Sequence, residues 1–233
     1  DREKKELFFL ETRKSLEKVL PQVKEQFLRD CIISKAYNAK DLDFFQNLFG
    51  ISSSSFRLVL FKPERDCDYI EKFALKKISE EIIAENNINV HLSTVIDENV
   101  LLLINSFDNA FLTEVLEKIK LSFFNYYGIN LTIAISNSNS FDKIHRMYIE
   151  TQECLQYAFY LGIGSIVSRE DILLHESGNY SLDYDFNKIA MAVRTGNIES
   201  AIRELDNFFE KTRKDKMNTD LAKSYCSELY HAI

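Results

Sequence analysis

The chain is poor in the residues that build phosphate-binding loops and disulfide frameworks. It contains no tryptophan, two prolines, four cysteines and six glycines among 233 residues. None of the glycines forms a G-x-G-x-x-G or G-x-x-x-x-G-K pattern, in which backbone amides cradle a phosphate. A G-x-S-x-G turn is also missing, and the serine run at 52–55 has the composition of a loop. These absences exclude the common sequence signatures of nucleotide binding and of serine-nucleophile catalysis.

Cysteine and histidine are too scattered to predict a metal centre. The cysteines lie at Cys31, Cys67, Cys154 and Cys226. The histidines lie at His91, His145, His175 and His231. Neither residue type shows the close spacing of zinc ligands, and no C-x-x-C pair occurs. We therefore expect reduced, mostly buried thiols, structural or surface histidines, and no metal or other cofactor.

Long apolar runs are missing as well, and acidic residues outnumber basic ones. No segment approaches the roughly 18 apolar residues that a membrane span needs, and no signal-peptide pattern opens the chain. The formal net charge of −7 disfavours a sequence-independent grip on nucleic acid. Because the chain opens at Asp1 and closes at Ile233 inside charged helical patterns, we expect a middle piece of a longer protein. We predict a cytoplasmic region that touches neither membrane nor DNA by itself.

The chain does contain a regular alternation of strand and helix patterns between residues 55 and 136. Runs rich in β-forming residues predict strands, and apolar residues at helical spacing predict helices between them. The expected strands are 55–62, 89–96, 100–105 and 130–136, and the expected helices are 66–85 and 109–127. The short gap between the second and third strands predicts a hairpin. This β-α-β-β-α-β order is typical of the ferredoxin-like arrangement, an antiparallel sheet covered on one face by two helices.

Further patterns extend this core on both sides. A helix over 141–161 and a short strand over 162–168 are expected to follow it, and a short helix over 41–49 precedes it. After Tyr184 two apolar helical stripes are separated by Gly196 and Asn197, which predicts a helical hairpin, and another helix begins near Asp220. We therefore expect an α+β fold in three parts: N-terminal signalling helices over 1–50, the sheet domain over 51–175, and C-terminal helices over 176–233.

The first 23 residues carry a short seven-residue repeat. Phe9, Leu16 and Val23 recur every seven residues, and Thr12 and Val19 fill the alternate positions. One interpretation is a two-stranded coiled coil that makes the protein a homodimer; the alternative is a helix that only covers the domain. The contact residues of the coiled coil would be Leu7, Phe9, Leu16, Val19 and Val23.

Pro21 interrupts this N-terminal pattern. Its nitrogen cannot donate a hydrogen bond to the preceding helical turn, so proline either starts a helix or kinks one. We expect a new helix to start at Pro21. The apolar residues after it recur at helical spacing, at Val23, Phe27, Leu28, Cys31 and Ile32. This stripe is suited to packing on the core.

Residues 131–172 (LTIAISNSNSFDKIHRMYIETQECLQYAFYLGIGSIVSREDI) carry a more specific pattern. They fit Y-x-E-A-x-x-A-L-x-Y-x-F-x-x-G before a final strand, at Tyr148, Glu150, Leu155, Tyr157, Phe159, Gly162 and Gly164. Thr151 and Cys154 replace the usual alanines. The stretch 15–32 (SLEKVLPQVKEQFLRDCI) fits L-P-x-x-x-x-x-F-L, and 194–211 is similar to a helical connector. Together these segments resemble the middle region of AraC-type response regulators of the YesN group.

The resemblance implies a defined place for this chain in a larger protein. In that family a receiver domain, phosphorylated by a sensor histidine kinase, precedes the middle region. A C-terminal AraC-type module with two helix-turn-helix motifs follows it and binds DNA. Neither end module lies within the 233 residues. Contact with the kinase and with DNA would therefore be made only through those other modules.

The expected sheet is also similar to that of diguanylate cyclases, which allows an enzymatic alternative. Those enzymes carry Gly-Gly-Asp/Glu-Glu-Phe in the central hairpin and an acidic residue on the first strand, because two metal ions bridge the nucleotide phosphates. Here the hairpin contains Asp97, Glu98 and Asn99 without a glycine pair. The first strand ends at Phe61 and Lys62 without a carboxylate. We interpret 97–99 as a degenerate active-site loop and predict no catalytic, cofactor-binding or metal-binding residue.

The resemblance thus implies a non-enzymatic module that transmits a signal and dimerises in a bacterial two-component transcriptional regulator. It would link the receiver domain to the DNA-binding domain. The alternative is a sensing domain that binds a small molecule or nucleotide in the groove beside the sheet, where the cyclase-like plan puts its substrate.

Overall fold

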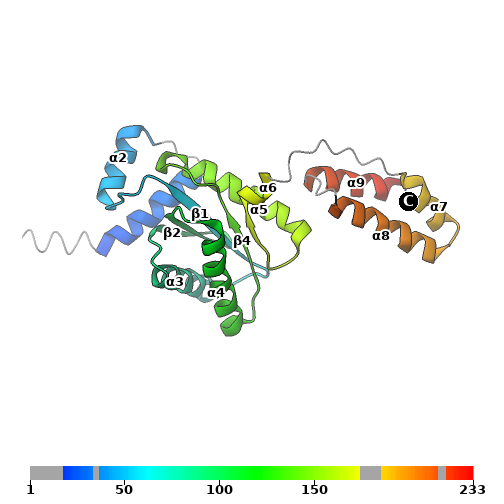
Figure 1. Cartoon of the computed structure of the whole chain (residues 1–233), viewed down its shortest axis with the longest axis horizontal. Helices are drawn as coiled ribbons and strands as arrows, with labels where there is room; N and C mark the ends of the chain where they lie inside the picture. Colours follow the sequence, from blue (N-terminus) through cyan, green and yellow to red (C-terminus); the bar gives the residue numbers. More distant parts are fainter. Residues whose placement is uncertain (1–17, 34–36, 174–184, 215–218, 233) are drawn as a thin grey trace, which may run out of the picture.

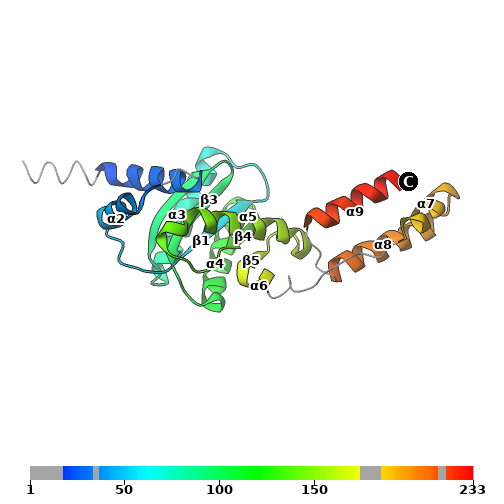
Figure 2. The ribbon, with the colours of Figure 1, turned by 90° about the horizontal axis from the view of Figure 1, so that it is seen from above.

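The structure consists of a helix-covered sheet and a further group of helices beside it (Figures 1 and 2). The computed structural model describes residues 18–33, 37–173, 185–214 and 219–232. The strands are β1 (Phe56–Pro63), β2 (Val90–Ile96), β3 (Asn99–Asn105), β4 (Leu131–Ile135) and β5 (Ile166–Ser168). Within these residues the N-terminal helix covers 18–32. The helices after it are α2 (Ala39–Leu48), α3 (Tyr69–Glu85), α4 (Asn109–Tyr127), α5 (Ile144–Leu161), α6 (Arg169–Leu173), α7 (Phe186–Arg194), α8 (Ile198–Lys214) and α9 (Thr219–Ala232).

The predicted order of strands and helices is confirmed, and the fold is α+β. The strands lie side by side as β2-β3-β1-β4-β5. Strands β1 to β4 are antiparallel to their neighbours, as expected. The sheet as a whole is mixed, because the added strand β5 pairs in parallel with β4. Helix α5 joins these two strands as a crossover, and such a connection returns the chain in the same direction.

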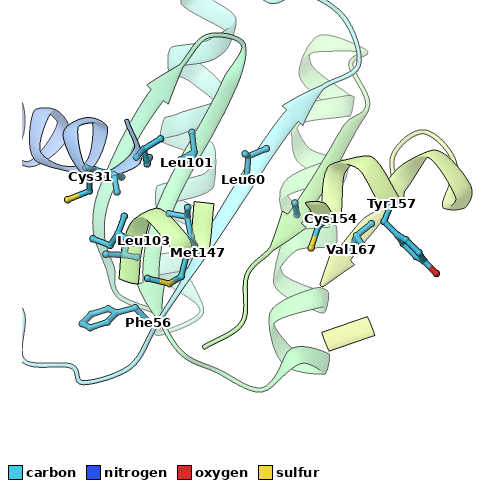
Figure 3. Packing of buried hydrophobic residues seen from close by; sticks show 14 of the residues in the cluster. Cys31, Phe56, Leu60, Leu101, Leu103, Met147, Cys154, Tyr157 and Val167 are labelled. Atoms are coloured by element: carbon cyan, nitrogen blue, oxygen red, sulfur yellow. The ribbon is translucent and has the colours of Figure 1, made fainter. Parts of the chain in front are cut away.

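Both faces of the sheet are buried: the two helices of the β-α-β-β-α-β unit cover one face, as expected, and helices outside that unit cover the other. Helices α3 and α4 pack on one face, where Leu75, Ile83 and Leu116 join a buried cluster. The N-terminal helix, α2 and α5 cover the other face, where Phe27, Met147 and many neighbours form a second cluster. Figure 3 shows Met147 of this second cluster next to Phe56 and Leu103 of the sheet. The extra helices outside the β-α-β-β-α-β unit therefore complete the core.

Strand β1 is a nearly continuous apolar run that lies in the centre of the sheet. Side chains alternate between the two faces of a strand. Accordingly Val59 and Phe61 lie in the cluster under α3 and α4. Leu58 and Leu60 lie in the opposite cluster. Because both faces are covered, neither set of positions needs polar residues.

Pro21 does not start a new helix. Residues 18–20 are already helical, and the helix continues without interruption through Pro21 to residue 32. The prediction of a helix start at Pro21 is therefore wrong. Because the described helix begins at residue 18, Pro21 lies within its first described turn, a position that proline tolerates. The turns after it pack on the core, since Phe27, Leu28, Cys31 and Ile32 are all buried.

The C-terminal helices form the predicted hairpin and a third helix. Gly196 separates α7 from α8 and adopts a left-handed φ of 69°. The rings of Phe186 and Phe208 meet edge to face at 5.6 Å and join the two helices. Tyr225 of α9 packs against Phe186 with ring centroids 6.1 Å apart. No helix in the described ranges is long and apolar enough to span a membrane.

Candidate functional site

Two of the three residues at 97–99, interpreted above as a degenerate active-site loop, form the tight turn between β2 and β3. Ile96 pairs with Asn99, so Asp97 and Glu98 alone make the turn. Asp97 has a φ of 52°, in the left-handed region that aspartate tolerates better than most residues. The predicted hairpin is thus confirmed, and its turn residues have a structural use.

Lys72 of α3 pairs with an acidic side chain and a backbone carbonyl of this turn. Its Nζ lies 2.7 Å from Oε1 of Glu98 and donates to the carbonyl oxygen of Asp97 at 3.2 Å. The hydrogen bond from Lys72 holds the pKa of Glu98 below its usual value. A metal ion at Glu98 would have to compete with this ammonium group. Within the described ranges, no three His, Cys, Asp or Glu side chains gather closely enough to hold a metal ion.

Carboxylates cap the backbone amides at the start of α3, beside the same turn. The side chain of Asp68 accepts the N–H of Glu71, and Glu71 accepts the N–H of Asp68. Arg65 also lies 2.6 Å from Glu71. The amides of a helix N-terminus are a common phosphate site. Here two carboxylates already occupy this end of the helix, which disfavours an anionic ligand.

The end of strand β1 offers no chemistry for a nucleotide site. Phe61 is fully buried, and the next residue, Lys62, is exposed. The side chain of Phe61 belongs to the buried cluster under α3 and α4. Phe61 and Lys62 thus place one side chain in the core and one in solvent at this end of the sheet.

The N-terminal helix is attached to the sheet region by polar contacts as well as by its buried face. Arg29 donates through Nη2 to the carbonyl oxygen of Val95 at 2.9 Å, on the edge strand β2. Glu25 forms an ion pair with Lys76 of α3 at 2.9 Å. At the other end, Nδ1 of His145 lies 2.9 Å from the carbonyl oxygen of Ile32. The helix thus contacts α3, the edge strand β2 and α5.

Of the predicted coiled-coil residues, the structure describes two, and one of them is exposed while the other packs on the core. Leu7, Phe9 and Leu16 lie outside the described residues. Val19 is 50% exposed, as a dimer contact requires. Val23 instead packs against the buried cluster of its own chain. The exposed part of the proposed coiled coil therefore extends no further than Val19.

The tyrosine- and glycine-containing pattern of α5 has a packing role. Glu150 accepts the N–H of Asn137 at 3.0 Å and fixes the loop between β4 and the helix. Cys154 and Tyr157 are buried, and burial raises the pKa of the Cys154 thiol to about 12. Gly162 ends the helix with a φ of 94° and a ψ of 171°, which is open essentially only to glycine. The motif thus holds α5 on the sheet and ends it.

Sequence reasoning missed a polar network at the opposite end of β1. Arg57 is buried, lies 2.6 Å from Glu170 of α6 and donates to Asn109 of α4 at 2.6 Å. Asn109 also donates to Ser168 at 3.4 Å. A signal for it existed, because an arginine inside the apolar run SFRLVLFK needs a buried acceptor. The network joins β1, α4, β5 and α6.

One buried cluster connects the two ends of the described chain. It contains Phe27 and Leu28 of the N-terminal helix and Met147 and Tyr157 of α5. It also contains residues of the C-terminal helices, namely Ile189, Phe208 and Leu229. Contacts between α5 and α9 join the helical group to the sheet region. Figure 3 shows Cys31 near one end of this cluster and Tyr157 near the other.

In comparisons with known proteins, no family model and no curated protein matches the chain. The resemblance to AraC-type response regulators therefore depends on the motifs quoted above, and the function derived from it is a proposal.

Proposed function

We propose that this chain is a non-enzymatic signal-transmission and dimerisation module of a bacterial two-component transcriptional regulator. It would link a receiver domain to an AraC-type DNA-binding domain, and its sheet would be of the ferredoxin-like, nucleotide-cyclase-like kind. The strand order β2-β3-β1-β4, with antiparallel neighbours, supports the proposed fold relationship.

The observation that carries the proposal is the buried cluster shared by the N-terminal helix, α5 and the C-terminal helices. A change in how two N-terminal helices pair would alter the packing of Phe27 and Leu28. Because close-packed interiors transmit strain, the change would pass through α5 to Phe208 and Leu229. The C-terminal helices would then shift between two arrangements, which is a population shift of a bistable element.

The contacts around the degenerate loop support the non-enzymatic part of the proposal. Lys72 is paired with Glu98, and Asp68 and Glu71 cap the start of α3. These contacts place an ammonium group and two capping carboxylates beside the hairpin turn, where the cyclase-like plan puts metal and phosphates. Incubation with GTP and Mg²⁺ or Mn²⁺ should release no pyrophosphate; metal-dependent release would refute this part.

The signal-transmission part is tested by joining two N-terminal helices covalently. Val19 is exposed, so Val19→Cys in a Cys226→Ser background can be oxidised to a disulfide-linked dimer. We expect hydrogen exchange of amides in α7–α9 to change on oxidation. The control is Leu121→Cys in the same background, which links two chains through the exposed side of α4. Equal exchange in the C-terminal helices of oxidised and reduced Val19→Cys would contradict transmission.

A further inference from the structure

Strand β2 contains an irregularity that turns a histidine toward the N-terminal helix. The register with β3 shifts between Val90 and Leu92, so His91 is the extra residue of a β-bulge. In a regular strand, neighbouring side chains lie on opposite faces. Here Leu92 belongs to the buried cluster under the N-terminal helix, and the His91 ring contacts Phe56 of the same cluster at 5.4 Å. The bulge thus places an ionisable ring on the face of the sheet that this helix covers.

The His91 ring lacks the partner that a charged imidazole needs. Its Nε2 and the nearby Oδ1 of Asn105 are buried, and neither atom has a hydrogen-bond partner of good geometry within the described ranges. Among the described residues, Lys24 of the N-terminal helix is the charged group that acts on the ring. The Nζ of Lys24 lies 5.7 Å from the centre of the Phe49 ring. A positive charge on His91 would therefore be desolvated and would face an ammonium group.

Aromatic contacts connect His91 to the N-terminal helix. Phe56 also meets Phe141 edge to face, with ring centroids 5.7 Å apart. Phe141 in turn stacks on Phe27 of the N-terminal helix at 5.5 Å. The imidazole is thus one end of a close-packed aromatic row under that helix. Because close-packed interiors transmit strain, a change at His91 acts on the helix through this row.

We propose that His91 is a pH-sensitive switch in the docking of the N-terminal helix on the sheet. The neutral ring packs under the helix and keeps it docked. A proton on the ring puts a charge into the buried place beside Lys24, and the helix then moves away so that water reaches the ring. The switch concerns the attachment of the helix to its own sheet, so it does not depend on the proposed function.

The direction of the pH effect follows from the surroundings of the ring. Burial is the largest cause and lowers the pKa of His91; the contact with Asn105 opposes it, and the charge of Lys24 lowers the pKa further. The ordinary value is about 6.5, so the docked form binds fewer protons than the open form as the pH falls through that value. Docking is therefore strongest when His91 is neutral in both forms, and it weakens as the pH falls from there toward the lower pKa of the docked form.

The test compares the labelling of two buried thiols in the full chain at about pH 7.5 and about pH 5.5, on either side of the ordinary histidine pKa. Cys31 belongs to the N-terminal helix and Cys154 to α5, and burial raises the pKa of both thiols to about 12. Thiol chemistry therefore changes with pH by the same factor at both sites, and the ratio of Cys31 to Cys154 labelling reports undocking of the helix. In a Cys226→Ser background this ratio should rise at least about threefold at the lower pH. An unchanged ratio would overturn the proposal.

Two variants identify the groups responsible. His91→Gln keeps a polar side chain that stays neutral, so its labelling ratio should be the same at both pH values. Lys24→Met keeps an unbranched apolar side chain and removes the cation, so the ratio should rise less than in the parent chain. His231→Gln, at an exposed position of α9, is the control and should behave as the parent.

The variants also supply the contrary results. A rise in His91→Gln equal to that of the parent chain would overturn the proposal. An undiminished rise in Lys24→Met would contradict the part assigned to Lys24. Circular dichroism at both pH values checks that each variant is folded, and Lys24→Met decides the matter if the glutamine variant does not fold.

Discussion

Arg29 and Val95 connect the N-terminal helix to the open edge of the sheet. The Arg29 guanidinium donates to the Val95 carbonyl at 2.9 Å, although the two residues are 66 positions apart. Glu25 lies 3.6 Å from Arg29 and 2.9 Å from Lys76, so one carboxylate connects this contact to α3. The helix proposed to receive the signal is therefore attached by charged groups over a buried apolar face. Such an attachment can shift without exposing the whole core.

Arg29→Ala should loosen this attachment without unfolding the domain. The variant loses one charge-assisted hydrogen bond at a half-exposed site, which costs about 1 kcal/mol. For a chain of this size the melting temperature should fall by roughly 2–4 °C. Hydrogen exchange should rise in β2 more than in β4. Gln22→Ala, on the exposed side of the same helix, is the control and should change neither quantity. Unchanged exchange in β2 after Arg29→Ala would contradict the attachment.

Two glycines offer a matched test of backbone strain at helix ends. Gly162 has φ 94° and ψ 171°, and Gly128 has φ 66° and ψ 21°. A Cβ at either position meets no atom within 4 Å, so any cost comes from the backbone. Gly128→Ala should cost about 1 kcal/mol because alanine tolerates the left-handed region. Gly162→Ala should cost more, up to about 3 kcal/mol. Urea unfolding measures both, and equal costs would mean that the end of α5 is not fixed as described.

Thiol reactivity should separate Cys226 from the other cysteines. Cys226 is exposed, and Cys31, Cys67 and Cys154 are buried. Burial raises the pKa of Cys31 and of Cys154 to about 12. The thiolate is the reactive form, so both stay unreactive at pH 8. A thiol reagent at pH 8 should modify one cysteine in the folded chain and all of them in denaturant. Cys226→Ser should abolish the fast reaction; a remaining fast thiol would show that one of the buried sites opens.

Local sequence patterns were sufficient to predict the elements of the sheet region. The run SFRLVLFK, the two-residue gap at Asp97 and Glu98, and Gly128 each specify a strand, a hairpin or a helix end through contacts between near neighbours. Strand β5 was expected near its observed place in the chain, but no local pattern gave its direction of pairing, because that direction depends on how α5 crosses the sheet. The helix start predicted at Pro21 was wrong because residues 18–20 are already helical, and proline is tolerated anywhere in the first turn of a helix, so its position does not fix the first helical residue.

The contacts that define the candidate site could not be predicted in the same way. Lys72 and Glu98 belong to different elements, and nothing in the spacing of either element indicates the pair. Val23 fits the seven-residue repeat as well as Val19 does, yet only the folded structure shows that it packs against its own core. The spacing of apolar residues shows that one side of a helix is apolar. It does not show whether that side packs against the same chain or against another chain.

The ion pair between Lys72 and Glu98 should make stability depend on pH in the acid range. The hydrogen bond from Lys72 lowers the pKa of Glu98 in the folded state. Its contribution is therefore complete above the unfolded pKa of about 4.3 and is lost as the pH falls through the lower folded value. Glu98→Gln should unfold at a lower urea concentration than the parent chain at pH 7, and the difference should shrink between about pH 5 and about pH 3. Glu81→Gln, at an exposed position of α3, is the control and should follow the parent at every pH. A difference for Glu98→Gln that stays constant down to pH 3 would mean that the glutamine disturbs the turn itself and that the charge of Glu98 contributes nothing.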